Sequence, residues 1–461
     1  ALAQAGLITK RAEGHDEMVA IAHQVYRDVV YEQITGASRT QLHGAAYSAL
    51  NVIDPSLQST RPDILAIHAQ AARDWDHAAV HALNAGESLL KQSALIEAGH
   101  FLEMADAALT RLPDAFAVRQ MRLRAITGLA SVERSRFGIA TDRSATLGQA
   151  AVQLARELGD SPTELLALNG LYAHALVRAD YPVAEDYAQA LLETAQRSQS
   201  KTFEMIGTRA IGAVAFHRSD YRTAIANLTK ALDQYDKQEH LPLAHAHGYD
   251  HAEICAAFLS MSHWLIGDLE RSQHFSRFSI SHSREIGHAH SLAQAMAFRV
   301  LLGGLAREGS ALNTIGAEAV ELGEKFDIRV MRAAGLFFPF ATQLCRQPHA
   351  PDGDDLIELK ARLKEFREVN PFNYSPLVAS LMADVYLRCD DVAAAEKILA
   401  EGTKAESYTG ETWTSPELLR MRARVSDAKG AAEEAQSLRK RALKSANDAG
   451  AFSLSLRVAC D

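Results

Sequence analysis

From about Arg61 onward, apolar residues recur at spacings of three and four along the chain. This spacing places them on one face of a helix, so each segment of about 12–20 residues predicts an amphipathic helix. The segments 165–176 and 224–232 show the pattern with leucine, tyrosine and alanine. Short breaks rich in Gly, Asp, Ser or Pro, as at 158–162 and 266–268, separate the helices and join antiparallel neighbours. The chain is therefore predicted to form successive helical hairpins.

One short element recurs and gives the hairpins a common phase. It reads Asp, a bulky apolar residue, two variable residues and a small residue, and its copies begin at Asp74, Asp180, Asp220, Asp268 and Asp391. The bulky residue can fill the corner between two helices, while the small residue lets the preceding helix approach closely. This pattern is typical of the second helix of a tetratricopeptide repeat. We predict an all-α fold, a tetratricopeptide-like helical-hairpin solenoid that forms a superhelix.

The repeat spacing leaves one alternative open. Three consecutive copies are 40 and 48 residues apart, longer than a strict tetratricopeptide repeat, which indicates longer helices or insertions in the turns. Asp also caps helix N-termini in general, so an unrelated bundle of hairpins would contain some of the same signals. The shared phase of the five copies favours the repeat.

The first part of the chain has a different pattern. Two short extended stretches at 7–11 and 18–22 surround Gly14 and predict a β-hairpin, or wing. Helices are predicted at 24–34 and 39–52. Further along, the longest polar break lies at 347–355, where we expect a flexible boundary.

Composition narrows the class of protein. Alanine is frequent and aromatic residues make up only 7% of the 461 residues, which favours close helix packing over a β-sandwich. The net charge of −9, spread without long runs, argues against direct binding to nucleic acid. The four cysteines form no CxxC spacing and no stretch reaches the length of a membrane span, so we expect reduced thiols, no membrane contact and a cytoplasmic location.

Candidate chemistry is sparse. Phosphate-binding, dinucleotide-binding, zinc-protease and hydrolase motifs are missing from the sequence, so we expect no catalytic residues, no cofactor and no metal. His240, His245, His247 and His251 form the densest histidine cluster, and a continuous helix would stack 247, 251 and 255 on one face. Such a face could hold a metal, but Pro242 and Gly248 predict a loop, so we interpret these histidines as solvated or capping.

The three tryptophans and one polar segment before a helix are further candidates for packing or contact positions. Trp75 and Trp264 fall on repeat-core positions, whereas Trp413 lies in a polar stretch and is expected in an exposed loop before Pro416. Tyr249, Asp250 and His251 combine polar side chains with a predicted helix N-terminus, and we take them as the candidate contact site for a ligand or partner. The alternative is that Asp250 simply caps its helix.

Several phrases of the sequence resemble a known family. Ala-Gln-Ala-Gly-Leu-Ile at 3–8, the helix at 21–34 and Gln-Leu-His at 41–43 resemble the end of the winged-helix part of STAND-type signalling ATPases. Asp-Ile-Leu-Ala-Ile-His-Ala at 63–69 and His-Ala-Leu-Asn-Ala-Gly-Glu at 81–87 look like the helices that begin the tetratricopeptide region of that family.

A second phrase is similar to bacterial class III adenylate or guanylate cyclases fused to such an ATPase. It comprises residues 247–255 with Trp-Leu-Ile-Gly-Asp at 264–268. His247 and His251 stand where the family usually has Tyr and Pro, which is a departure from its pattern. The resemblance implies that residues 1–55 are the end of a winged-helix domain with connecting helices, and residues 56–461 the repeat array. The chain, which does not start with Met, would then be a fragment whose cyclase and ATPase domains lie upstream.

The sequence thus predicts a non-catalytic regulatory or sensor arm. A protein partner or small-molecule effector would bind its concave repeat surface and shift the upstream ATPase between states. Two alternatives share the same fold: the arm of a maltose-regulator or LuxR-like transcriptional activator, and a scaffold that self-assembles into a homo-oligomer.

Overall fold

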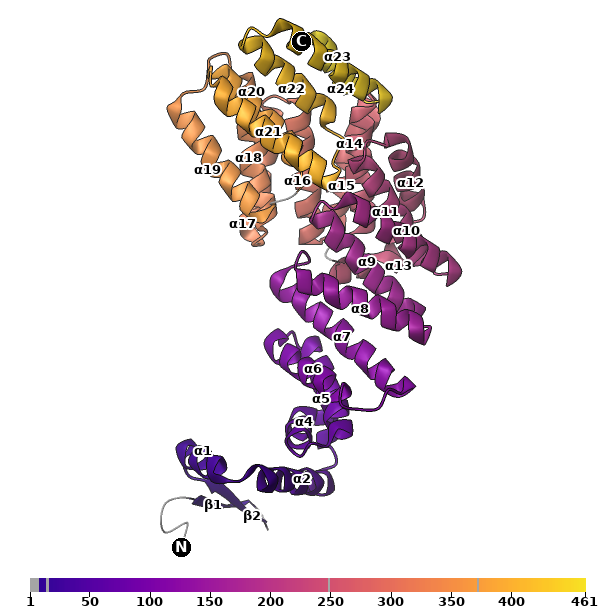
Figure 1. Cartoon of the computed structure of the whole chain (residues 1–461), viewed down its shortest axis with the longest axis vertical. Coiled ribbons are helices and arrows are strands. Elements are labelled where there is room, and N and C mark those ends of the chain that lie inside the picture. Colours follow the sequence, from indigo (N-terminus) through magenta and orange to yellow (C-terminus); the bar gives the residue numbers. More distant parts are fainter. Residues whose placement is uncertain (1–7, 14–15, 248, 371–372) are drawn as a thin grey trace. The chain divides into compact units, whose positions relative to one another are not determined.

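The computed structural model describes residues 8–13, 16–247, 249–370 and 373–461 (Figure 1). Its two strands are β1 (Ile8–Glu13) and β2 (Asp16–Ile21). In chain order the helices are α1 (Gln24–Gln33), α2 (Gly36–Ile53), α3 (Leu57–Thr60), α4 (Pro62–Ala71), α5 (Trp75–Lys91), α6 (Leu95–Leu109), α7 (Phe116–Phe137), α8 (Asp142–Leu158), α9 (Ser161–Val177), α10 (Tyr181–Arg197), α11 (Lys201–His217), α12 (Tyr221–Asp233), α13 (Lys237–His247), α14 (His251–Leu265), α15 (Leu269–Ile286), α16 (Ala289–Ala306), α17 (Ala311–Lys325), α18 (Arg329–Arg346), α19 (Gly353–Val369), α20 (Ser375–Arg388), α21 (Val392–Thr409), α22 (Ser415–Ala428), α23 (Ala432–Asp448) and α24 (Phe452–Cys460). The predicted all-α, tetratricopeptide-like fold of helical hairpins is confirmed.

The N-terminal stretches form the expected hairpin. β1 pairs antiparallel with β2, so that Ile8 lies opposite Ile21 and Glu13 opposite Asp16. Helices α1 and α2 follow, close to the ranges that the sequence predicts. Gly14, the expected turn residue, lies outside the described residues.

The chain divides into two compact units, Ala1–Asp160 and Ser161–Asp461. The sequence pattern predicts no boundary at this position. The loop at 347–355, where a flexible break was expected, lies within the second unit, and Arg388 Nη2 donates hydrogen bonds to the carbonyls of Gln347 and His349 at 2.5 and 3.0 Å. Among the described residues, no helix has the length and apolar character needed to cross a membrane.

The recurrent Asp element marks a local turn between two helices. The residue before each Asp adopts a positive φ, which ends the preceding helix; these residues are Arg73, Ala179, Ser219, Gly267 and Asp390. The Asp backbone N–H donates to the carbonyl five residues earlier, and its side chain accepts the N–H three residues later. Each Asp therefore closes one helix and caps the next.

The small residue of the same element lies at a helix contact, as predicted. The five positions are at most 2% exposed: Ala78, Ala184, Ala224, Ser272 and Ala395. Glycine residues allow equally close contacts at other positions between helices. A Cβ atom at Gly207 of α11 would lie 2.9 Å from the Cα of Leu192 on α10, a distance that backbone atoms do not tolerate. Small side chains at these contacts thus set the spacing of the helices.

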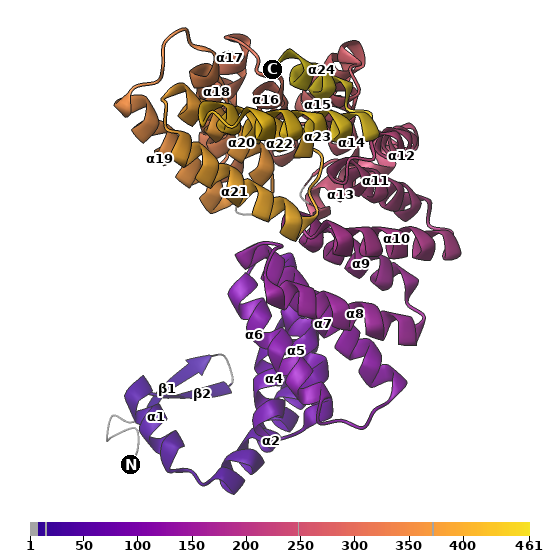
Figure 2. The same cartoon turned by 45° about the horizontal axis from the view of Figure 1, so that its top comes forward.

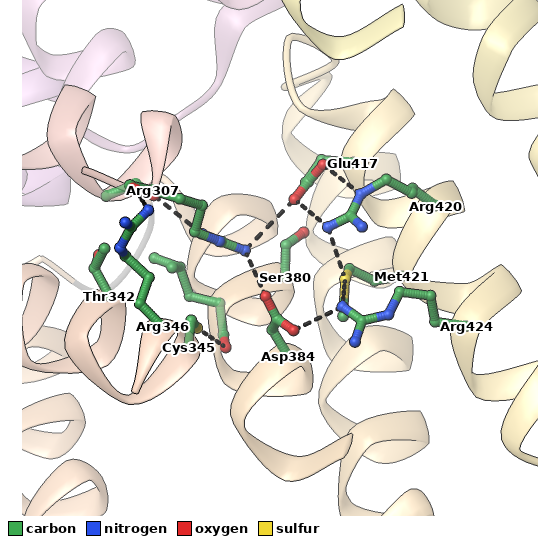
Figure 3. Close-up of polar contacts among 12 residues, drawn as sticks. Arg307, Thr342, Cys345, Arg346, Ser380, Asp384, Glu417, Arg420, Met421 and Arg424 are labelled. Carbon is green, nitrogen blue, oxygen red and sulfur yellow. Dashed lines mark hydrogen bonds and ion pairs between the residues drawn. The ribbon is translucent and has the colours of Figure 1, made fainter. Parts of the chain in front are cut away.

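In the second unit, the first helices of successive hairpins form a continuous row. Besides its own hairpin partner, each contacts the first helix of the next hairpin, from α9 through α11, α14, α16, α18 and α20 to α22. We call these seven helices the inner row. Apart from Arg307, which directly follows α16, the residues labelled in Figure 3 belong to inner-row helices.

The second unit also closes on itself. The loop before α22 lies against α11 and α12: Thr412 N–H donates to the His217 carbonyl at 2.9 Å, and the Tyr221 hydroxyl donates to the Trp413 carbonyl at 3.2 Å. Near the C-terminus, α24 contacts α14, where the Ser453 hydroxyl donates to the Trp264 carbonyl (Figures 1 and 2). The prediction that Trp413 is exposed is wrong, because this closure buries it completely.

Candidate functional site

The three residues predicted as a contact site lie at the start of α14. Asp250 is the N-cap: its Oδ1 accepts the backbone N–H groups of Ala252 and Glu253, both at 3.0 Å. Asp250 and His251 are buried and Tyr249 is half-buried. The local geometry matches the capping alternative for Asp250.

Asp250 has further partners inside the second unit. The Tyr235 hydroxyl donates to its Oδ2 at 2.6 Å, and Nε2 of His282 lies 2.9 Å from its Oδ1. Its backbone N–H donates to Ser291 Oγ at 2.7 Å. Burial favours a raised pKa for Asp250, but the hydrogen bonds from His282 and Tyr235 outweigh it, so that the pKa is lowered. The carboxylate of Asp250 is charged and fully used within the fold.

Tyr249 contacts Arg209, a residue that the sequence pattern does not single out. The guanidinium of Arg209, on α11, lies over the rings of Tyr172 and Tyr249, with 5.3 and 5.4 Å to the two centroids. Arg209 is 1% exposed, and its Nη2 donates to the Tyr249 hydroxyl at 3.3 Å. In the sequence, the one indication of a buried charge here is that Arg209 interrupts the apolar stretch that forms α11.

The surroundings of Arg209 are electrically neutral. In the described part of the chain, its guanidinium makes no ion pair and its Nε has no hydrogen-bond acceptor. Burial favours a lowered pKa for Arg209, yet its contacts with Tyr249 and Tyr172 outweigh it and the pKa is raised, so Arg209 is charged. Burial also raises the pKa of Tyr172 and of the Cys255 thiol to about 12, so both are neutral. Arg209 is therefore a buried cation whose contacts in the described part of the chain are with two tyrosines and not with an acidic group.

A second cluster of charges lies on the inner row between α16, α20 and α22 (Figure 3). Arg307 Nη2 lies 3.4 Å from Asp384 Oδ2 and 3.5 Å from Glu417 Oε1. Arg420 binds Glu417 through Nε and Nη2, at 2.9 and 2.8 Å, and Arg424 binds Asp384 at 2.6 Å. All of these charges are paired, so the cluster ties helices together.

One residue of α24 and the residue that follows this helix complete the cluster. Arg457 Nη1 lies 3.3 Å from Glu417 Oε1, and Asp461 accepts from Arg420 Nη1 at 2.5 Å. Burial favours a raised pKa for Glu417, but Arg420, Arg457 and Arg307 outweigh it and hold the pKa far below its usual range. Glu417 is therefore charged at neutral pH.

The closing loop brings a third buried polar group into the interior. Glu411 accepts from Trp413 Nε1 at 2.6 Å through Oε1, while its Oε2 has no partner among the described residues. Burial raises the pKa of Glu411 to about 8. Nearby, His217 stacks on Tyr181 with 4.3 Å between ring centroids, and burial lowers its pKa to about 3.

The histidine cluster is not brought together as one face. Residues 241 and 242 belong to α13, which ends at His247, whereas His251 begins α14, so 247, 251 and 255 do not share a helix. The His240 ring accepts the Asp236 N–H at 2.8 Å, and the side chains of His245 and His247 lie outside the described residues. Within the described ranges, no three His, Cys, Asp or Glu residues are grouped so that they could hold a metal ion.

Comparison with known proteins adds little beyond the fold. No family model matches the chain. An uncharacterised protein of Rhizobium meliloti (strain 1021) is 21% identical over 461 residues, which cover 99% of this chain but only 44% of that protein. The chain thus spans less than half the length of this relative.

The solved structures that are similar include two helical-repeat proteins. The Rap protein complexed with competence and sporulation factor matches with a TM-score of 0.52 and 10% identity, over 80% of this chain and 98% of that one. A STAND protein with a tetratricopeptide repeat sensor from Pyrococcus horikoshii matches with a TM-score of 0.42 and 14% identity, over 82% of this chain and 59% of that one. The first likeness shows a shared helical-repeat fold.

Proposed function

We propose that this chain is the non-catalytic regulatory arm of a larger signalling protein, and that it binds a protein partner or a small-molecule effector on its inner row. One observation carries the proposal: inner-row helices bury polar and charged side chains, among them Arg209, His217 and Glu253. Hairpin packing itself requires only small and aliphatic residues at such positions. Buried polar groups that packing does not need are expected where a ligand is bound.

Two further points support a regulatory role. The Rap protein of similar fold was solved in complex with competence and sporulation factor, so this fold can hold an effector. The Rhizobium relative is more than twice as long as the region that matches, which leaves room for other domains in a related protein. We accordingly keep residues 1–55 as the end of a winged-helix domain, residues 56–461 as the repeat array, and a cytoplasmic location as parts of the proposal.

The upstream partner within this proposal is an ATPase fused to a nucleotidyl cyclase, on the strength of the resemblance in residues 3–87 and 247–268. Control requires that the effector bind the active and inactive states with different affinity. The coding sequence on both sides of residues 1–461 tests this part. Cyclase motifs upstream support it, whereas a helix-turn-helix downstream without cyclase motifs favours the transcriptional activator.

A thermal-shift screen of fractionated cell extract tests ligand binding by the purified chain. We expect at least one fraction to raise the unfolding midpoint, because a ligand at about 100 times its Kd adds roughly 2.7 kcal/mol of stability. If no fraction shifts the midpoint and the chain oligomerises with rising concentration, the self-assembling scaffold is the better description.

A further inference from the structure

Arg209 presents one edge of its guanidinium without a strong acceptor. Nε has no hydrogen-bond partner among the described residues, and Nη2 on the same edge makes only the 3.3 Å bond to the Tyr249 hydroxyl. The guanidinium carbon lies 5.3 Å from the ring centroid of Tyr172 and 5.4 Å from that of Tyr249. These two rings contact the guanidinium, and its Nε–Nη2 edge keeps hydrogen-bonding capacity that the described residues do not use.

The same chain shows what normally binds to this edge. Arg124 holds Glu87 through Nε and Nη2 at 2.9 and 2.7 Å. Arg420 holds Glu417 through the same two atoms at 2.9 and 2.8 Å. In both cases a planar carboxylate accepts two parallel hydrogen bonds, the arrangement that suits a guanidinium best. At Arg209 the carboxylate is missing.

Among the described residues, no acidic group takes that place. The Asp250 carboxylate is occupied by Tyr235, His282 and the N-terminus of α14. Burial raises the pKa of Glu253 well above its usual range, so this group is neutral, and it accepts from the Ser279 hydroxyl on α15. A buried cation without a counter-charge is costly, and removing that cost is a strong driving force for binding an anion.

We infer that the Nε–Nη2 edge of Arg209 is the binding site for a carboxylate group of the effector. The incoming carboxylate displaces the Tyr249 hydroxyl, whose long hydrogen bond is weak, and Tyr172 remains stacked beneath the guanidinium. The inference rests on the proposed function and gives its ligand a chemical class. It also places the contact at Tyr249, next to the capping Asp250, which keeps its role in the fold.

Thermal shift of the whole chain with defined probes tests the site. The probes are acetate, succinate, inorganic phosphate, trialanine and trialanine amide, at pH 7 and constant ionic strength maintained with chloride. We expect succinate or acetate, or trialanine but not its amide, to raise the unfolding midpoint in a saturable manner. A shift with succinate or acetate indicates a small-molecule effector, and a shift with trialanine but not its amide indicates a peptide C-terminus. A shift with phosphate alone, or with none of the probes, overturns the inference.

Three variants identify the residue responsible. Arg209→Met retains the bulk of the side chain and removes the uncompensated charge, so its midpoint without probe is expected to equal or exceed that of the wild type, while the carboxylate shift is lost. Tyr249→Phe removes the competing hydroxyl and should bind the carboxylate up to about tenfold more tightly. Arg284→Gln, at an exposed ion pair with Glu318, is the matched control and should respond like the wild type.

The outcomes separate this inference from the proposed function. If an extract fraction stabilises Arg209→Met as strongly as the wild type, the chain binds an effector but not through Arg209. The inference is then wrong, while the proposed function stands. If Arg209→Met does not fold, Tyr249→Phe still decides: unchanged or weaker carboxylate binding in this variant contradicts displacement of the hydroxyl.

Discussion

At the scale of single residues, two buried glutamates show how neighbours decide the charge state. Glu417 and Glu411 are both almost completely inaccessible. Three arginines surround Glu417 and outweigh burial, so its pKa is lowered. The polar contacts of Glu411 include Trp413 but no cation, so burial raises its pKa to about 8. Of these two buried carboxylates, Glu417 is ionised at neutral pH and Glu411 has a pKa of about 8.

We predict that Glu411 makes the second unit less stable as pH rises. Its folded pKa of about 8 exceeds the ordinary value of 4.5, so its stabilising contribution is complete below pH 4.5 and is lost as pH rises through 8. Between these values the loss is about 1.4 kcal/mol per pH unit. Glu411→Gln cannot titrate and should exceed the wild type by about 2–3 kcal/mol at pH 7. Urea unfolding from pH 4.5 to 9 measures the difference.

Glu358→Gln is the control, because Glu358 lies in an exposed ion pair with Arg362. Its stability should follow that of the wild type across the whole range. Parallel curves for Glu411→Gln and the wild type would falsify the assignment of this titration to Glu411.

At the scale of elements, arginine–carboxylate pairs join helices that are far apart in the sequence. Glu417 on α22 and Asp384 on α20 both bind Arg307, which directly follows α16 (Figure 3). Glu417 also binds Arg457 on α24. These contacts act across hairpins, in addition to the small-residue packing within them. The C-terminal helices are thereby tied to the middle of the second unit.

Glu417→Gln is predicted to weaken this connection strongly. Removing the charge leaves Arg420 and Arg457 buried with too little negative charge, which costs about 3–5 kcal/mol. Glu318→Gln removes a carboxylate from an exposed pair with Arg284 and should cost less than about 1 kcal/mol. Urea unfolding at pH 7 compares both with the wild type. A loss below about 1 kcal/mol for Glu417→Gln would show that the cluster does not hold the helices together.

At the scale of the whole molecule, the chain comprises two compact units, and the second is closed. In an open repeat array each repeat contacts only its neighbours, so a mutation acts locally. Here the loop before α22 contacts α11 and α12 across 192 residues or more of sequence. Trp413 packs on Phe216, with 5.1 Å between ring centroids, at the centre of this contact. The second unit should therefore respond as one body.

Trp413→Ala is predicted to loosen helices remote from it in sequence. Loss of a fully buried tryptophan costs about 3–5 kcal/mol and removes the cover of α11 and α12. Hydrogen exchange of the amides in 201–233 should rise by at least tenfold. Leu456→Ala, at an exposed side chain of α24, is the control and should leave exchange of these amides unchanged. If Trp413→Ala changes exchange only near residue 413, the closure does not couple the two ends.

The hairpins and their turns could be predicted from the sequence because they depend on neighbouring residues. Asp180 illustrates this: the turn needs only a residue of positive φ before it, a cap, and a small residue four positions later. All of these groups lie within one stretch of chain, so their pattern is visible without the fold. The capping role of Asp250 was foreseen for the same reason.

The properties of Arg209 and Trp413 could not be obtained in this way. Arg209 becomes a buried, unpaired cation only where α9, α11 and the start of α14 meet, and Trp413 is buried by helices about 190 residues earlier. Residue type alone favours exposure for an arginine and for a tryptophan in a polar stretch. The sequence by itself determined the helices, their caps and their close contacts, which are local; the tertiary structure decided which side chains face the interior, because burial and charge depend on residues distant in the chain.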